Sequence, residues 1–228
     1  MPNCQHTSAS APSPLADLAL IAVLVVYAVS VILLFWDSPY ILTLLLMPAP
    51  AALVCRLGRS FVTVAAAGTI LGPATEAACV AGGLWSYAET GGLPLIPPWL
   101  FVIWACFPTA LWLIVRAAIG HIPKVRTGTM PLAVFGIALE IVIFVSFPDE
   151  MLHLFALALM LAAGVFVARP GRATLILMAA GSILGPVCEA LPVAAGAWSY
   201  AAPQILGMPV WLPLAYALFA SLVAHASL

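Results

Sequence analysis

The sequence predicts an all-α polytopic membrane protein of eight transmembrane helices, built as a parallel 4+4 internal repeat with both termini in the cytoplasm. Three observations lead to this fold class. Hydrophobic residues make up 65% of the 228-residue chain and charged residues only 7%, whereas a soluble domain carries about 25% charged residues. The apolar runs are long enough to cross a bilayer and lack the alternation of barrel strands. A segment around Glu76 recurs around Glu189.

The apolar runs define the expected spans, which short polar loops separate. The second and sixth are short, and the third and seventh are long enough to tilt or break. In chain order, the expected spans are residues 15–36, 40–55, 60–87, 98–119, 130–147, 151–168, 173–200 and 208–227. We expect a disordered N-terminal tail over residues 1–14, a first four-helix repeat over 15–119, a cytoplasmic linker over 120–129 and a second four-helix repeat over 130–228.

The basic side chains indicate the orientation of these spans. All seven lie in or beside the loops after the second, fourth and sixth spans, and the opposite loops carry acidic residues but no basic one. Eight spans with cytoplasmic termini satisfy the positive-inside rule, so we expect a multi-pass protein of the cell (inner) membrane. The net charge of -1 says little about partners, and no basic cluster indicates a nucleic acid, so we expect no nucleic-acid partner. Nothing in the sequence indicates the oligomeric state.

The internal repeat relates the two halves of the chain. Residues 66–88 are identical at 16 of 23 positions to the segment that begins 113 residues later, at position 179. Because four spans separate the copies, both enter the membrane in the same direction. The expected relation is a pseudo-twofold axis along the membrane normal.

Glu76 and Glu189 are the central candidate residues. Each lies 17 residues beyond an arginine at the cytoplasmic end of its span, Arg59 or Arg172, or about 25 Å along a helix. This places both carboxyl groups in the outer half of the hydrocarbon layer, where an isolated charge costs several kcal/mol. Each acid must therefore face the bundle interior, either protonated or paired.

A proline precedes each glutamate by three residues. Proline cannot donate a backbone hydrogen bond, so we expect a helix break that exposes backbone carbonyls beside each acid. The expected break residues are Gly72, Pro73, Gly185 and Pro186.

A Trp-Ser-Tyr triplet follows each glutamate, at Trp85 to Tyr87 and at Trp198 to Tyr200. An aromatic belt at the membrane interface is the ordinary interpretation. The alternative is an aromatic lid over a pocket whose floor is the glutamate, where ring faces could stabilise a cation.

Glu140 is a third acid within an expected span, and the matching position in the first half is Tyr27. The two halves therefore differ near the midplane. The four histidines have no spacing that would form a metal cluster, and the chain has no phosphate-binding loop. We expect no metal and no cofactor.

The run Glu76, Gly82-Gly83, Trp85 and Tyr87, followed by Gly92, Pro94, Pro97 and Trp99, resembles a pattern in the integral-membrane carotenoid hydratase and lycopene-cyclase-like families. The resemblance covers about 25 residues in each half. It implies an all-helical enzyme that acts on isoprenoids dissolved in the bilayer, by acid–base chemistry at a C=C bond and without a redox cofactor.

The leading hypothesis is therefore a membrane-embedded acid–base enzyme of cyclase or hydratase type, with membrane lipids around it and a lipophilic small molecule as substrate. A neutral, dry glutamate can protonate an alkene, and a second carboxylate can take the proton back. The candidate catalytic residues are Glu76, Glu189 and Glu140, and the candidate substrate-binding residues are Trp85, Tyr87, Trp198, Tyr200, Trp99 and Trp211.

Two other classes remain open. A proton-coupled transporter also combines repeats with membrane carboxylates, although the cytoplasmic halves of the third and seventh spans offer few polar residues for a path. A non-catalytic membrane subunit is the third class, in which the glutamates form hydrogen bonds that join the halves, each contributing about 1 kcal/mol.

Overall fold

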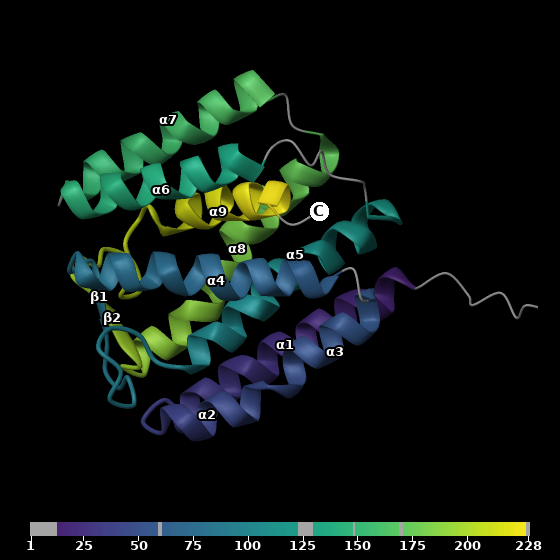
Figure 1. The fold of residues 1–228 in the computed structure, drawn as a ribbon, viewed down its shortest axis with the longest axis horizontal. Coiled ribbons are helices and arrows are strands. Elements are labelled where there is room, and N and C mark those ends of the chain that lie inside the picture. Colours follow the sequence, from purple (N-terminus) through teal and green to yellow (C-terminus); the bar gives the residue numbers. More distant parts are fainter. Residues whose placement is uncertain (1–12, 59–60, 123–129, 148, 169–170, 227–228) are drawn as a thin grey trace, which may run out of the picture.

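The computed structural model is a helical bundle with one small sheet (Figure 1). It describes residues 13–58, 61–122, 130–147, 149–168 and 171–226. Most of the expected N-terminal tail and of the expected linker lies outside the described residues. In chain order the elements are α1 (Pro14–Phe35), α2 (Pro39–Leu46), α3 (Pro48–Leu57), α4 (Phe61–Ala81), β1 (Trp85–Tyr87), α5 (Trp99–Ile119), α6 (Met130–Ser146), α7 (Glu150–Ala168), α8 (Arg172–Ala194), β2 (Trp198–Tyr200) and α9 (Leu212–Ala226).

Four helices form the centre of the bundle. Helix α4 packs along α5, and α8 packs along α9, while α5 and α8 also contact each other. Helices α1, α2 and α3 pack against α5, and α6 and α7 pack against α9. These outer helices lie on opposite sides of the centre, α1 to α3 at the bottom of Figure 1 and α6 and α7 at the top. The arrangement places both glutamate-bearing helices, α4 and α8, in the middle.

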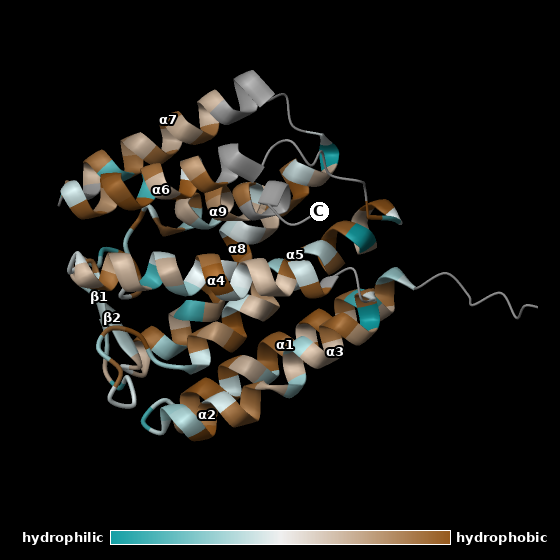
Figure 2. Cartoon of the chain, in the orientation of Figure 1, coloured by the Kyte–Doolittle hydropathy of each residue, from teal (hydrophilic) through white to brown (hydrophobic). Residues whose placement is uncertain are grey.

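The chain is a multi-pass membrane protein. Among the described residues, five helical segments have the length and hydropathy to span a bilayer: Pro14–Phe35, Pro39–Leu57, Val62–Ala81, Trp99–Ile119 and Arg172–Ala194. Three shorter apolar helices are Val134–Ser146, Met151–Ala163 and Leu212–Leu222. Apolar residues extend along most of the helices, and hydrophilic residues lie at several helix ends and also within α4 (Figure 2).

The two repeated helices end earlier than the sequence predicts. We expected spans that continued to Tyr87 and Tyr200, but α4 ends at Ala81 and α8 at Ala194. The cause is a glycine after each helix, Gly83 at φ 77° and Gly196 at φ 81°. The left-handed backbone at these glycines turns the chain out of the helix.

The expected helix breaks at the prolines are wrong. Helix α4 continues through Pro73, and α8 continues through Pro186 and Pro192. A proline removes one backbone donor, and the remaining hydrogen bonds and the packing against α5 and α9 maintain the helix. The neighbouring Gly72 and Gly185 serve close packing, as described below.

Candidate functional site

The Glu76 carboxylate accepts hydrogen bonds from three aromatic side chains. Its Oε2 accepts from Trp85 Nε1 at 2.9 Å and from the Tyr87 hydroxyl at 2.6 Å. Its Oε1 accepts from Trp104 Nε1 at 3.3 Å. All three donors lie in the first half of the chain, so this half satisfies its own acid.

Glu189 has a matching set of donors. Its Oε2 accepts from Trp198 Nε1 at 3.3 Å and from the Tyr200 hydroxyl. Its Oε1 accepts from the Tyr216 hydroxyl. We call the two glutamates and these six aromatic residues the glutamate–aromatic network. Buried carboxylates are stable only when their lone pairs are satisfied in this way.

The turns after α4 and α8 bring the Trp-Ser-Tyr triplets back over the glutamates. The Gly83 amide donates to the Val80 carbonyl at 3.0 Å, and the Leu84 amide donates to the Cys79 carbonyl at 3.1 Å. This pair of bonds is the Schellman motif of a helix C-terminus. The same pair follows α8, where the Gly196 amide donates to Val193 and the Ala197 amide donates to Pro192.

The two triplets pair as antiparallel strands. The register joins Trp85 to Tyr200, Ser86 to Ser199 and Tyr87 to Trp198. The ring centroids of Trp85 and Tyr200 lie 5.6 Å apart, and those of Tyr87 and Trp198 lie 5.9 Å apart. The sheet therefore joins the two halves directly above their glutamates.

Glycines bring the third donor of each set within reach. A Cβ atom on Gly72 would lie 2.1 Å from the Trp104 indole, and one on Gly185 would lie 2.3 Å from the Tyr216 ring. Only glycine leaves room for each ring to cross the glutamate-bearing helix one turn before the acid. The motif Gly-Pro-x-x-Glu thus positions an aromatic donor instead of breaking a helix.

The remaining predicted site residues lie around this network. Glu140 on α6 is 4% exposed, and its Oε2 has no hydrogen-bond partner among the described residues. Trp99 at the start of α5 is 3% exposed, and its Nε1 is equally unpartnered within the described part of the chain. Trp211 packs against Phe144 at a ring-centroid distance of 4.5 Å and against His153 at 5.7 Å.

Two cavities adjoin the network. The main cavity encloses about 1060 Å³ including its open mouth, and α1, α3, α5 and α8 supply most of its apolar lining. Glu76, Glu189, Trp99 and the two strands line one part of it. A second cavity of about 460 Å³ is lined by Glu76, Glu189 and Glu140 together. The structure therefore brings the three predicted acids to a common space.

Sequence reasoning missed two of the network's donors, Trp104 and Tyr216. Trp104 follows Glu76 by 28 residues, and Tyr216 follows Glu189 by 27 residues, so the second half is one residue shorter between the acid and this donor. A search of the two halves for polar aromatic residues in this shifted register would have found them.

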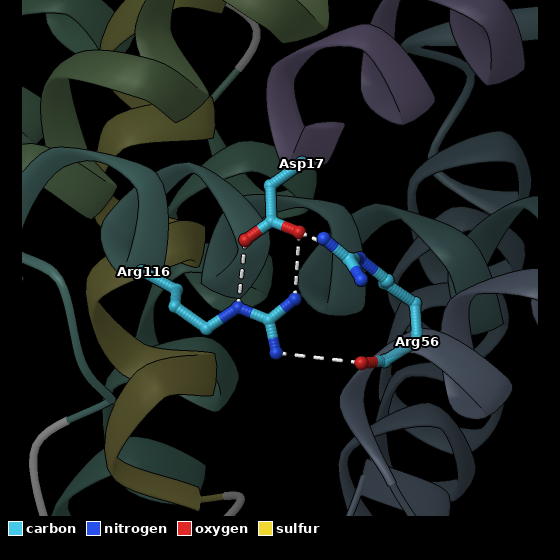
Figure 3. Close-up of polar contacts among 3 residues, drawn as sticks. All are labelled: Asp17, Arg56 and Arg116. Atoms are coloured by element: carbon cyan, nitrogen blue, oxygen red, sulfur yellow. Dashed lines mark hydrogen bonds and ion pairs between the residues drawn. The ribbon is translucent and has the colours of Figure 1, made fainter. Parts of the chain in front are cut away.

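Sequence reasoning also missed a buried ion cluster, which Figure 3 shows. Asp17 on α1 is fully buried, and its carboxylate accepts from Arg56 Nε at 2.8 Å and from Arg116 Nε and Nη2 at 2.7 Å each. Arg116 Nη1 also donates to the Arg56 carbonyl at 3.3 Å. The cluster ties α1, α3 and α5 together, and the paired, hydrogen-bonded geometry offsets the cost of burying the charges.

Comparison with known proteins gives a fold but no family. No family model and no curated protein matches the chain. Two solved structures are similar, both of MvINS, which is described as a mycobacterial Insig homolog from Mycobacterium vanbaalenii. That structure is 21% identical with a TM-score of 0.54, and a cross-linked trimer of an MvINS cysteine variant is 20% identical with a TM-score of 0.57. Each match covers 74% of this chain and 93% of MvINS.

The chain shares the fold of an Insig homolog. The resemblance to carotenoid hydratases and lycopene cyclases is therefore wrong, because the similar solved structures are of MvINS, which is described as an Insig homolog. The hypothesis of an isoprenoid-modifying enzyme, which the resemblance and the buried glutamates suggested, is also overturned.

Proposed function

We propose that this chain is a non-catalytic membrane protein that binds a membrane lipid in its main cavity. The observation that carries the proposal is a largely apolar cavity with one buried, unpartnered donor, Trp99 Nε1, among the described residues. Ligand pockets combine apolar walls with a few polar groups that fix orientation. The similarity in fold to an Insig homolog supports the same class of protein.

The glutamates have a structural role in this proposal. Each carboxylate accepts three hydrogen bonds from tryptophan and tyrosine side chains of its own half. These bonds fix the rings that form one end of the cavity, while apolar side chains such as Leu24, Val25 and Leu53 line its length. The shape suits an elongated lipid whose hydroxyl or ester oxygen accepts a hydrogen bond from Trp99.

The number and orientation of the membrane spans are a second part of the proposal. We propose eight spans arranged as a parallel repeat with both termini in the cytoplasm. The distribution of basic residues supports this orientation, and the matching donor sets of Glu76 and Glu189, 113 residues apart, support the repeat. We also propose that the chain assembles with copies of itself, because MvINS has been crystallised as a cross-linked trimer.

Lipid extraction and native mass spectrometry test the lipid-binding proposal. Purified wild-type protein should retain a lipid, and Trp99→Phe should lower the affinity for that lipid about tenfold, because it removes one buried donor worth about 1.4 kcal/mol. Ala110→Trp, which adds bulk in the main cavity, should abolish retention. Trp36→Phe is the matched control, because Trp36 does not line the main cavity. Equal lipid occupancy in wild-type protein and Ala110→Trp would overturn the proposal.

A further inference from the structure

The second cavity differs in chemistry from the main one. It lies between α4, α6 and α9, and its lining includes Glu140 and Phe144 of α6 and Phe219 of α9, none of which lines the main cavity. The two cavities share six residues of the glutamate–aromatic network: Glu76, Trp85, Trp104, Glu189, Tyr200 and Tyr216.

Glu140 is the unexplained group in this cavity. Glu76 and Glu189 each accept three hydrogen bonds, but Glu140 Oε2 is buried without a partner among the described residues. Buried polar atoms in folded proteins nearly always have a hydrogen-bond partner, so an exception needs a reason. Because the Glu140 side chain lines the second cavity, a ligand in this cavity can supply the missing donor.

The charges around the cavity favour a positively charged donor. Three carboxyl groups line it, and among the residues whose side chains the structure describes, no lysine, arginine or histidine does. The arginines of the described ion cluster, Arg56 and Arg116, pair with Asp17. Among the described residues no three acidic, histidine or cysteine side chains are placed to hold a metal ion. An organic cation fits this charge distribution.

The aromatic lining is a second reason to expect an organic cation in this cavity. The ring centroids of Trp104 and Phe219 lie 4.6 Å apart, and those of Phe144 and Trp211 lie 4.5 Å apart. All four side chains line the second cavity. Faces of tryptophan and phenylalanine rings attract alkylammonium groups, and the attraction is stronger where water is excluded.

We propose that the second cavity binds a small organic cation, an alkylammonium group, with Glu140 as its hydrogen-bond acceptor and the surrounding rings as its walls. This site adjoins the proposed lipid site and shares part of its lining, but Glu140 lines only the second cavity. A primary ammonium has three donors, one of which would satisfy Glu140 Oε2. The Coulomb attraction of Glu76 and Glu189 would assist without breaking their existing hydrogen bonds.

Titration calorimetry on the protein in lipid nanodiscs tests the proposal with n-butylammonium and its neutral analogue, 1-butanol. We expect n-butylammonium to bind at least tenfold more tightly than 1-butanol. Glu140→Gln should lose that preference, and Glu89→Gln, the same change at an exposed carboxylate, should retain it. Equal binding of the two compounds by wild-type protein would overturn the proposal. The comparison of the two compounds uses wild-type protein alone, so it tests the cation site even if Glu140→Gln does not fold.

Unchanged affinity of Glu140→Gln for n-butylammonium would also overturn the proposal. The lipid assay separates the two sites, since Glu140→Gln should keep its bound lipid while Ala110→Trp should lose it and still bind n-butylammonium.

Discussion

At the scale of single residues, the network shows how a membrane interior accommodates a carboxylate. Charged groups in the hydrocarbon are stable when they face protein and are paired. Tryptophan Nε1 can only donate, and three of the six donors are tryptophans. The third donor is Trp104 in one half and Tyr216 in the other, so the donor is preserved where the ring type is not.

Removing one donor should destabilise the protein measurably. Tyr216→Phe leaves Glu189 Oε1 without its hydroxyl partner, and a hydrogen bond to a charged group contributes about 1.5–3 kcal/mol. We expect a decrease of this size in the free energy of unfolding, measured by titration with a denaturing detergent. Tyr40→Phe is the control, because the Tyr40 hydroxyl donates at an exposed site. If Tyr216→Phe and Tyr40→Phe have the same free energy of unfolding, the network does not stabilise the fold.

At the scale of helices and strands, small residues set the spacing of the two central helix pairs. Gly68 and Gly72 face α5, and Gly181 and Gly185 face α9, where a Cβ atom would contact backbone or ring atoms within 3 Å. Membrane helices approach closely where small residues line their interface. Each pair of glycines is one turn apart, so a single face of α4 or α8 carries both.

Adding one methyl group to that face should separate the helices. In Gly72→Ala, the new Cβ would overlap the Trp104 indole, and overpacking of this type costs about 1–3 kcal/mol. The indole would also move away from Glu76. We expect a lower melting temperature together with a change in tryptophan fluorescence.

Gly171→Ala provides the comparison, because a Cβ there meets nothing within 4 Å. A melting temperature for Gly72→Ala equal to that of Gly171→Ala would show that close packing at this helix face is not needed.

The elements also show what the sequence could and could not reveal. The apolar runs predicted the helices and the membrane location, because hydropathy and length determine both. The three-residue strands gave no recognisable pattern, and only the tertiary pairing of Trp85 with Tyr200 makes them strands. The proline at Pro73 suggested a break, but packing outweighed the loss of one backbone donor.

The contacts around the site were harder to predict because they join distant parts of the chain. Asp17 meets partners 39 and 99 residues away, a separation that no local pattern encodes. The function inferred from the repeated glutamates was wrong for a related reason. A buried acid beside aromatic residues suits catalysis as well as a satisfied hydrogen-bond network, and the sequence does not show which donors reach it.

At the scale of the whole molecule, the β1–β2 pair is the direct link between the halves above the glutamates. The Ala88 amide donates to the Ala197 carbonyl at 3.0 Å, and the Ala201 amide donates to the Leu84 carbonyl at 2.9 Å. The helix contacts between the halves join α5 to α8 and α9, α4 to α6 and α9, and α1 to α8. The same strands close one end of the main cavity, so pairing and cavity shape are coupled.

A disulfide across the strands should form without distortion. Ser86 and Ser199 are directly opposite, with hydroxyl oxygens 3.4 Å apart, so cysteines at these positions lie within reach of a cross-link. In the double variant Ser86→Cys/Ser199→Cys, mild oxidation should give an intramolecular disulfide that joins the halves. Peptide mass spectrometry would identify it, and Ser86→Cys alone is the control. Failure of the double variant to cross-link would contradict the strand register.

The division of donors between the halves has a consequence for how the protein is made. Every donor to Glu76 lies between residues 85 and 104, and every donor to Glu189 lies between residues 198 and 216. As the chain leaves the ribosome, the first half can shield its acid in the bilayer before the second half has been synthesised. Neither glutamate needs a hydrogen-bond donor from the other half when it enters the bilayer. Pairing of the strands can then be the last step of assembly, between two units already inserted in the membrane.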